Sequence, residues 1–103
     1  MAGFFEQAKQ AMALRSKMKK IQRDLEVATK EYENAGVKVV VHCDMTIASV
    51  VITDPAVLDP ARVDRLQRTI TENANKALRL AKDEAQERMK AATKDMGLGG
   101  MLG

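Results

Sequence analysis

The fold is decided by residues 34–52, which read NAGVKVVVHCDMTIASVVI. Two runs of mostly β-branched residues, Val37–Val41 and Ile47–Ile52, each follow a group of turn-forming residues. Such runs favour strands, and a short loop between two strands favours antiparallel pairing. A third strand is expected from Val27 to Tyr32, where Glu and Lys residues would also suit a longer preceding helix. Residues 26–53 are therefore predicted to form a three-stranded antiparallel meander, with the geometry of the glycine-free turn at Cys43-Asp44-Met45 left open.

A helix is predicted before the meander, over residues 4–25, and no proline interrupts it. Its apolar residues recur every three or four positions, which places them on one face of a helix. They are Phe4, Ala8, Ala11, Leu14, Met18, Ile21 and Leu25.

A second, much longer helix is predicted over residues 60–96. Asp54-Pro55 and then Asp59-Pro60 follow the meander, and the second pair places a capping carboxylate before a proline suited to a first helical turn. The apolar stripe of this helix runs through Val63, Leu66, Ile70, Ala74, Ala77, Ala81, Ala85, Met89, Ala92 and Met96. We expect one domain over residues 1–96 and a flexible Gly/Met tail over 97–103.

The length of the second helix has a consequence for assembly. It would extend for about 55 Å, whereas a compact chain of this size has a radius of gyration of about 13 Å. The helix must therefore overhang its own domain and pack against the first helix or a second subunit. We predict an α+β fold with protruding helical arms that forms a tweezer-like homodimer, and the candidate interface residues lie in the strands: Val39, Val41, Val50 and Ile52.

The inventory of reactive side chains argues against an enzyme. His42 is the only histidine and Cys43 the only cysteine, and neighbouring residues on a strand point to opposite faces. We therefore expect no catalytic residues, no metal, no cofactor and no small-molecule substrate. The sequence also contains no signal-peptide-like or membrane-spanning apolar run, which favours a cytoplasmic protein without a membrane partner.

The charge is distributed unevenly along the chain. Residues 1–23 carry six basic and one acidic side chain (+5), residues 24–59 carry two and seven (−5), and residues 60–103 carry nine and six (+3). In the second helix, three pairs with the spacing i, i+4 favour local neutralisation: Asp64 with Arg68, Glu72 with Lys76, and Glu84 with Arg88.

The first helix carries basic residues without such partners. Arg15, Lys19 and Arg23 form an i, i+4, i+8 row, which we call the basic ladder. A run of charges is most often only the solvated face of a helix, but an unpaired row suits phosphate groups. The candidate DNA-binding residues are Lys9, Arg15, Lys17, Lys19, Lys20 and Arg23 in the first helix, with Arg79, Lys82 and Lys90 in the second.

The scarcity of aromatic residues argues against single-stranded nucleic acid as the ligand. Single-stranded nucleic acids are usually bound on aromatic platforms, and this chain has only Phe4, Phe5 and Tyr32. Duplex DNA is therefore the preferred partner, bound largely through electrostatic contacts with weak sequence preference. The alternative is a protein-binding or chaperone-like helical clamp that uses adaptable methionines: Met12, Met18, Met89, Met96 and Met101.

The order of these parts resembles the YbaB/EbfC family of bacterial nucleoid-associated proteins. The resemblance covers nearly the whole chain and rests on an ordered set of segments rather than one motif. They are Val37-Lys38-Val39, Ser49-Val50-Val51-Ile52 followed by Asp54-Pro55 and Leu58, Asn75-Lys76-Ala77-Leu78 with Ala81, Gln86-Glu87-Arg88-Met89, and the glycine-rich ending. Family members usually have glycines in both turns of the meander, whereas this chain has only Gly36. The resemblance implies a DNA-binding homodimer with tweezer-like arms that is localised to the nucleoid and influences DNA organisation and gene expression.

Overall fold

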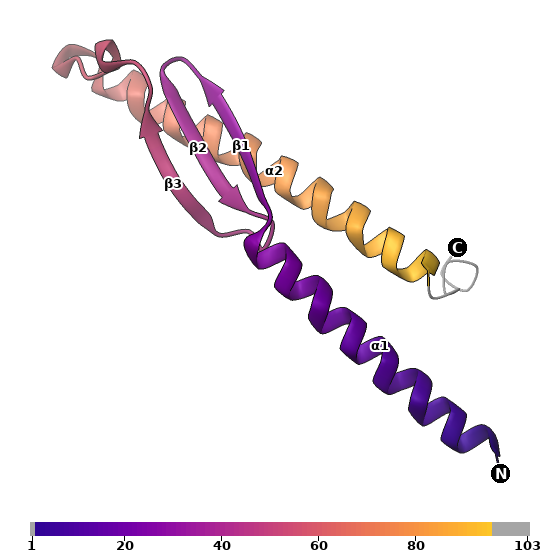
Figure 1. The fold of residues 1–103 in the computed structure, drawn as a ribbon. Helices are drawn as coiled ribbons and strands as arrows, with labels where there is room; N and C mark the ends of the chain where they lie inside the picture. The colour runs from indigo at the N-terminus through magenta and orange to yellow at the C-terminus, as the bar shows by residue number, and fades with distance from the viewer. Residues whose placement is uncertain (1, 96–103) are drawn as a thin grey trace.

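The computed structural model describes residues 2–95 and has the predicted α+β order of elements, a helix, a three-stranded antiparallel sheet and a long helix (Figure 1). The predicted tail at 97–103 lies outside the described residues. Two short 3₁₀ turns, η1 and η2, connect the sheet to the second helix. The elements are α1 (Ala2–Val27), β1 (Thr29–Asn34), β2 (Val37–His42), β3 (Ile47–Ile52), η1 (Pro55–Val57), η2 (Pro60–Arg62) and α2 (Val63–Asp95).

The sheet has the order β1-β2-β3, with β2 in the centre. Asn34 pairs with Val37 at the first turn, and Val39 pairs with Val50 in the second ladder. The first strand begins two residues later than predicted, because α1 continues through Val27 and the amide of Ala28 still donates to the carbonyl of Asp24 at 2.9 Å. The segment for which both helix and strand were expected thus contributes Val27 to α1 and the residues from Thr29 onward to β1.

The two turns of the meander use different means to reverse the chain. Ala35 and Gly36 both have positive φ angles, 53° and 82°, as the tight two-residue turn of a twisted hairpin requires. In the glycine-free turn, Met45 takes the left-handed conformation at φ 72°. There the carboxylate of Asp44 accepts hydrogen bonds from the backbone amide and the hydroxyl of Thr46, which stabilises the turn without a glycine.

The start of the second helix differs from the prediction by three residues. Asp54 and Asp59 each accept a backbone hydrogen bond from the residue two positions later, at 3.0 and 2.9 Å. Each cap begins a 3₁₀ turn rather than an α-helix, so Pro60–Arg62 form η2 and α2 begins at Val63. The two Asp-Pro pairs therefore act as successive corners that bring the chain back across the sheet.

The core lies between one face of β2 and the small residues of α2. Val37, Val39 and Val41 have no exposed surface, and they pack with Cys43, Ala77 and Ala81. Alternate residues of a strand point to one face, so the three valines all face α2, and the alanines permit close approach.

The expected dimer interface is only partly compatible with this core. The side chains of Val39 and Val41 are covered by α2 of the same chain, so these two predictions are wrong. Val50 remains 45% exposed and Ile52 is half-buried, because β3 lies at the edge of the sheet.

The molecule is elongated, with extents of 74 × 23 × 16 Å. Both helices extend past the same end of the sheet, the end at which β2 turns into β3 (Figure 1). The predicted overhang of α2 is thus confirmed. None of the helices within residues 2–95 is long and apolar enough to span a membrane.

Candidate nucleic-acid interface

The side of α1 that faces the rest of the chain is apolar. Ile21 is only 9% exposed, and Leu14, Met18 and Leu25, which lie three to seven residues from it, are half-buried. Residues three, four and seven apart share one face of a helix, so these four side chains form a continuous stripe. Since α1 contacts both α2 and β2, the stripe determines which side of α1 is turned outward.

The basic ladder lies on the outward side of α1. Arg15, Lys19 and Arg23 are all exposed, and their row runs from beside the apolar stripe at Arg15 to the opposite side of the helix at Arg23. Residues 9–23 carry six basic side chains and no acidic one. Among residues 2–95 the ion pairs are Arg62 with Asp59 and Arg88 with Glu84, neither of which involves α1. The positive charges of the ladder are therefore not neutralised by ion pairs within the described part of the chain.

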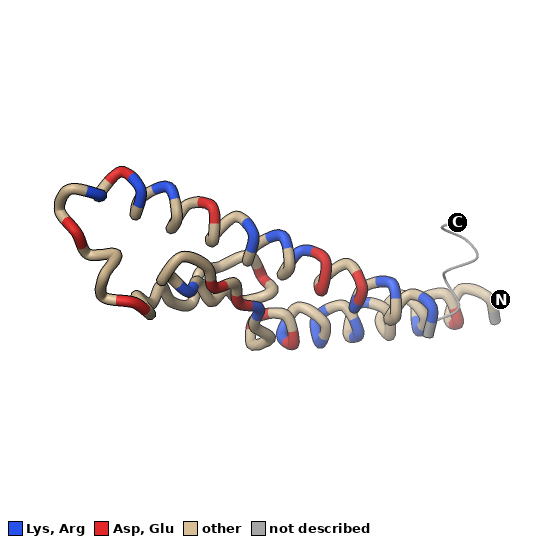
Figure 2. The backbone as a smooth tube through the Cα atoms, turned by 90° about the horizontal axis from the view of Figure 1, so that it is seen from above, with Lys and Arg blue, Asp and Glu red and all other residues tan. Residues whose placement is uncertain are grey.

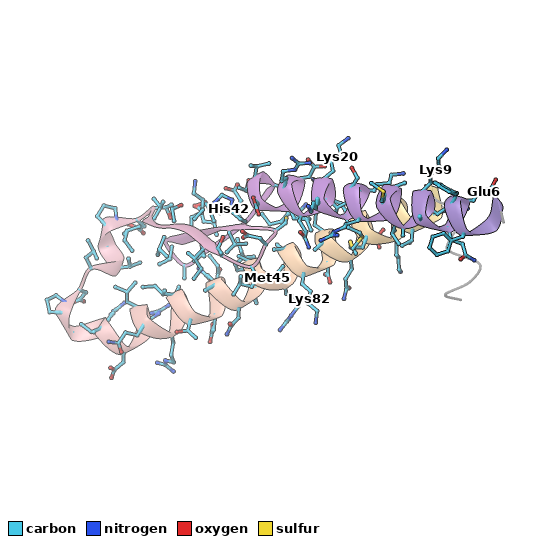
Figure 3. The ribbon with its side chains drawn as sticks, turned by 90° about the horizontal axis from the view of Figure 1, so that it is seen from below. Glu6, Lys9, Lys20, His42, Met45 and Lys82 are labelled. Carbon is cyan, nitrogen blue, oxygen red and sulfur yellow. The ribbon has the colours of Figure 1, made fainter. Side chains whose placement is uncertain are left out.

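The other basic candidates on α1 occupy different positions around the helix. Lys9 and Lys20 are exposed and extend away from α2 (Figure 3). Lys17 is half-buried, closer to the side of the apolar stripe. Lys9 and Lys20 therefore widen the surface of the ladder, whereas Lys17 is set apart from it.

The basic candidates on α2 form a separate surface. Arg79, Lys82 and Lys90 are exposed, and Lys82 extends away from α1, on the opposite side of the arms from Lys9 and Lys20 (Figure 3). Residues 79–90 carry four basic and three acidic side chains. Figure 2 shows the contrast, since basic and acidic positions alternate along α2 but are segregated along α1. One chain therefore presents a strong cationic surface on α1 and a weak one on α2.

The predicted neutralisation within α2 is only partly formed. Arg88 Nε lies 3.2 Å from Glu84 Oε1, as expected. Asp64 with Arg68 and Glu72 with Lys76 are not among the ion pairs of the described residues. Lys76 instead donates to the hydroxyl of Tyr32 at 3.1 Å and lies 4.9 Å from the centre of its ring.

The contact between Lys76 and Tyr32 also bears on the kind of ligand. Tyr32 is the only aromatic residue of the sheet, and it is half-buried beside α2. The opposite face of the sheet carries Glu31 and Glu33 on β1, because their partners Val40 and Lys38 alternate with the buried valines of β2. A nucleic acid would meet two carboxylates and the half-buried Lys38 there, so the cationic arms are the better surface for phosphate groups.

The neighbours His42 and Cys43 do not form a joint site. Cys43 is 2% exposed and belongs to the core, whereas His42 pairs with the exposed Thr29 on the far side of β2. Their side chains thus point to opposite faces, as predicted from strand geometry. No cluster of three metal-ligating side chains occurs among the residues that the structure describes.

Comparison with known proteins agrees with this arrangement. The model of the YbaB/EbfC DNA-binding family matches residues 1–96. A nucleoid-associated protein of Afipia carboxidovorans is 35% identical over 98% of this chain and 97% of its own length. A nucleoid-associated protein of Ruminiclostridium cellulolyticum is 37% identical over 92% of this chain and 82% of its own. With an elongated α+β fold, a cationic arm and a family match over almost its full length, the chain belongs to the YbaB/EbfC DNA-binding family.

Proposed function

We propose that this protein is a homodimeric, nucleoid-associated protein that binds duplex DNA mainly through the basic ladder of α1. The proposal rests mainly on residues 9–23, which carry six basic and no acidic side chains on a helix that projects from the domain. Neutralising phosphates releases condensed counterions, and this effect requires no base-specific contact. Weak sequence preference follows from this mechanism, and we propose that the protein acts at the cytoplasmic nucleoid in DNA organisation and gene expression.

The homodimer is supported by the open edge of the sheet. Among residues 2–95, β3 pairs only with β2, and it exposes Ile47, Val50 and Val51. An apolar sheet edge is normally paired or covered in a soluble protein. A second copy that covers the α2 side of this edge would hide Val50 and present the basic ladder twice on one assembly.

A salt titration tests DNA binding directly. Fluorescence polarisation of a labelled random-sequence duplex is measured with the full chain at salt concentrations from 50 to 200 mM. About six phosphate contacts predict a loss of affinity of about 10³-fold across this range. A shallow salt dependence would contradict the electrostatic mechanism, and no binding at the lowest salt would refute the proposed function.

A protein-binding clamp is the second candidate, and one observation favours it. Phe4 and Phe5 are 75% exposed and Met12 is 72% exposed, all near the free end of α1. Large apolar side chains at an arm tip could contact a client protein. Suppression of the aggregation of a heat-denatured enzyme, together with no binding to duplex DNA, would decide in favour of this function.

A further inference from the structure

The outward face of α1 changes its chemistry along the helix. Phe5, Met12 and Lys19 are each seven residues apart, which is about two helical turns, so they form one row. Ala8 and Arg15 have the same spacing and form the adjacent row. The face that carries the basic ladder near the domain therefore carries apolar side chains toward the tip.

The two halves of this face are contiguous. Met12 lines the same shallow groove as Arg15 and Lys19, and Lys19 also lines the next groove together with Arg23. From Phe5 to Arg23 the distance along the helix is about 27 Å at about 1.5 Å per residue. One turn of B-DNA is about 34 Å long, so a single turn of duplex can contact the whole face.

Phe4, Phe5 and Met12 are not part of the packing of the arm. They are among the most exposed large apolar side chains of the described residues. The apolar stripe that turns toward the domain uses Leu14, Met18, Ile21 and Leu25 instead. A single exposed apolar residue is ordinary. Here Phe5 and Met12 lie on the row of Lys19, and Phe4, which the apolar spacing assigns to the stripe, is 75% exposed and lies between the stripe and that row, so the three side chains indicate a contact surface.

We propose that Phe4, Phe5 and Met12 form an apolar wedge that enters a groove of the same duplex that the basic ladder holds and partly unstacks its base pairs. This proposal rests on the proposed function. Architectural proteins combine cationic contacts to phosphates with apolar side chains that open a base step and bend the duplex. The ladder neutralises the backbone, and the wedge lies further along the same face, where it meets bases rather than phosphates.

The charge of this face favours DNA over a second copy of the chain. Two copies that met through the tips of α1 would bring together two surfaces that each carry Lys9, Arg15 and Lys19, and Glu6 is the only acidic residue among residues 2–23 to compensate them. Duplex DNA supplies negative charge beside the ladder and apolar base surfaces beside the wedge. It therefore matches both halves of the face.

The test compares binding with distortion of the DNA. A 30-base-pair duplex carries 2-aminopurine to report unstacking and a donor and acceptor dye at its ends to report bending. The full-length protein is compared with Phe4→Ser/Phe5→Ser and with Val27→Ser, which changes an equally exposed apolar residue at the other end of α1. We expect wild type and Val27→Ser to raise 2-aminopurine fluorescence and shorten the distance between the duplex ends.

For the double variant we expect both distortion signals to be lost. The slope of log affinity against log salt should change by less than about one unit, which corresponds to about one phosphate contact. Phe5→Leu should retain the signals, because leucine also serves as a wedge. Wild-type binding without unstacking or bending would overturn the wedge but leave the proposed function standing. Unchanged DNA distortion by the double variant would also overturn the wedge. If that variant instead lost self-association, binding to lipid vesicles or protection of a client protein, the two phenylalanines would serve that other contact. No wild-type binding at low salt would refute the proposed function itself.

Discussion

The side-chain amide of Asn73, in the first half of α2, donates a hydrogen bond to the backbone carbonyl of Val37, at the start of β2, over 2.9 Å. The same nitrogen lies 3.0 Å from the carbonyl of Asn34, on the other side of the first turn. Asn73 is 1% exposed and is the only polar residue in the core of the described chain. One side chain thus fixes the register of α2 against the β1-β2 hairpin.

Replacing Asn73 should therefore destabilise the domain strongly. Asn73→Ala removes two hydrogen bonds, of which the one to Val37 is buried, at a cost of about 1–3 kcal/mol in the free energy of unfolding. Asn75→Ala, which changes an exposed asparagine two residues away, should cost less than about 0.5 kcal/mol. Urea denaturation followed by circular dichroism measures both values, and equal stability of the two variants would show that the hydrogen bonds of Asn73 are dispensable.

Gly36 should be equally sensitive, for a steric reason. A Cβ atom at this position would lie 2.6 Å from Val57 Cγ1 and 3.0 Å from Asp54 Cβ, and the backbone has φ +82°. The left-handed conformation alone costs alanine about 1–2 kcal/mol, and displacement of the η1 segment adds to that. Gly3→Ala is the matched control, because a Cβ atom at Gly3 would have nothing within 4 Å and alanine favours a helix. Thermal unfolding should show a lower Tm for Gly36→Ala and an equal or higher Tm for Gly3→Ala.

The elements themselves were largely predictable from the sequence, because hydrophobic period and turn residues act locally. The helix predicted over residues 4–25 extends over Ala2–Val27, and both β-branched runs are strands. Asn73 was missed because apolar spacing alone defined the stripe. Asn73 lies four residues before Ala77 and eight before Ala81, on the same face of α2, and a polar residue in that position was the available signal.

The predictions that failed concern how one helix or strand packs against another, which local sequence patterns do not determine. The alternation of valines in β2 and β3 is similar, so the sequence did not show that α2 covers Val39 and Val41 but leaves Val50 exposed. Likewise, Glu72 and Lys76 have the spacing of an ion pair, but Tyr32 from β1 lies within reach of Lys76. The exposed α1 ladder was predictable because it depends on helical periodicity and charge alone.

The pH dependence of the second turn follows from Asp44. The hydrogen bond from the Thr46 hydroxyl, supported by the Thr46 amide and the nearby His42, lowers the pKa of Asp44 below its ordinary value of 3.8. A lowered pKa in the folded state means that the carboxylate contributes stability above pH 3.8, and that this contribution is lost as the pH falls through the folded value. An NMR titration of the carboxyl carbon should give a midpoint below 3.8, and Thr46→Val should raise it. A wild-type midpoint at or above 3.8 would contradict the role of Thr46.

The open edge of the sheet can be tested with two neighbouring residues of β3. Val50 pairs with Val39 and shares the face toward α2, whereas Val51 pairs with Lys38 on the other face. If the second copy covers the α2 side of the edge, Val50→Lys should bury an unpaired charge and shift the protein to monomers at micromolar concentration. Val51→Lys adds the same charge and should leave the dimer intact. Sedimentation velocity distinguishes the species, and a monomeric wild type or a dimeric Val50→Lys variant would exclude this interface.

The segregation of charge between the arms predicts unequal effects on DNA binding. Arg15→Ala/Lys19→Ala/Arg23→Ala removes three cations from a stretch without acidic residues, so the slope of log affinity against log salt should decrease by about one unit for each lost phosphate contact. The same number of cations removed at Arg79, Lys82 and Lys90 should matter less, because Asp83, Glu84 and Glu87 already reduce the local potential. Arg62→Ala/Arg65→Ala/Arg68→Ala is the control for net charge, since it alters η2 and the start of α2, which lie farthest from the arm tips. If all three variants bound DNA equally well, total charge rather than the ladder would govern the affinity. A loss of affinity confined to the Arg15/Lys19/Arg23 variant, and seen on every duplex sequence, assigns the phosphate contacts to α1.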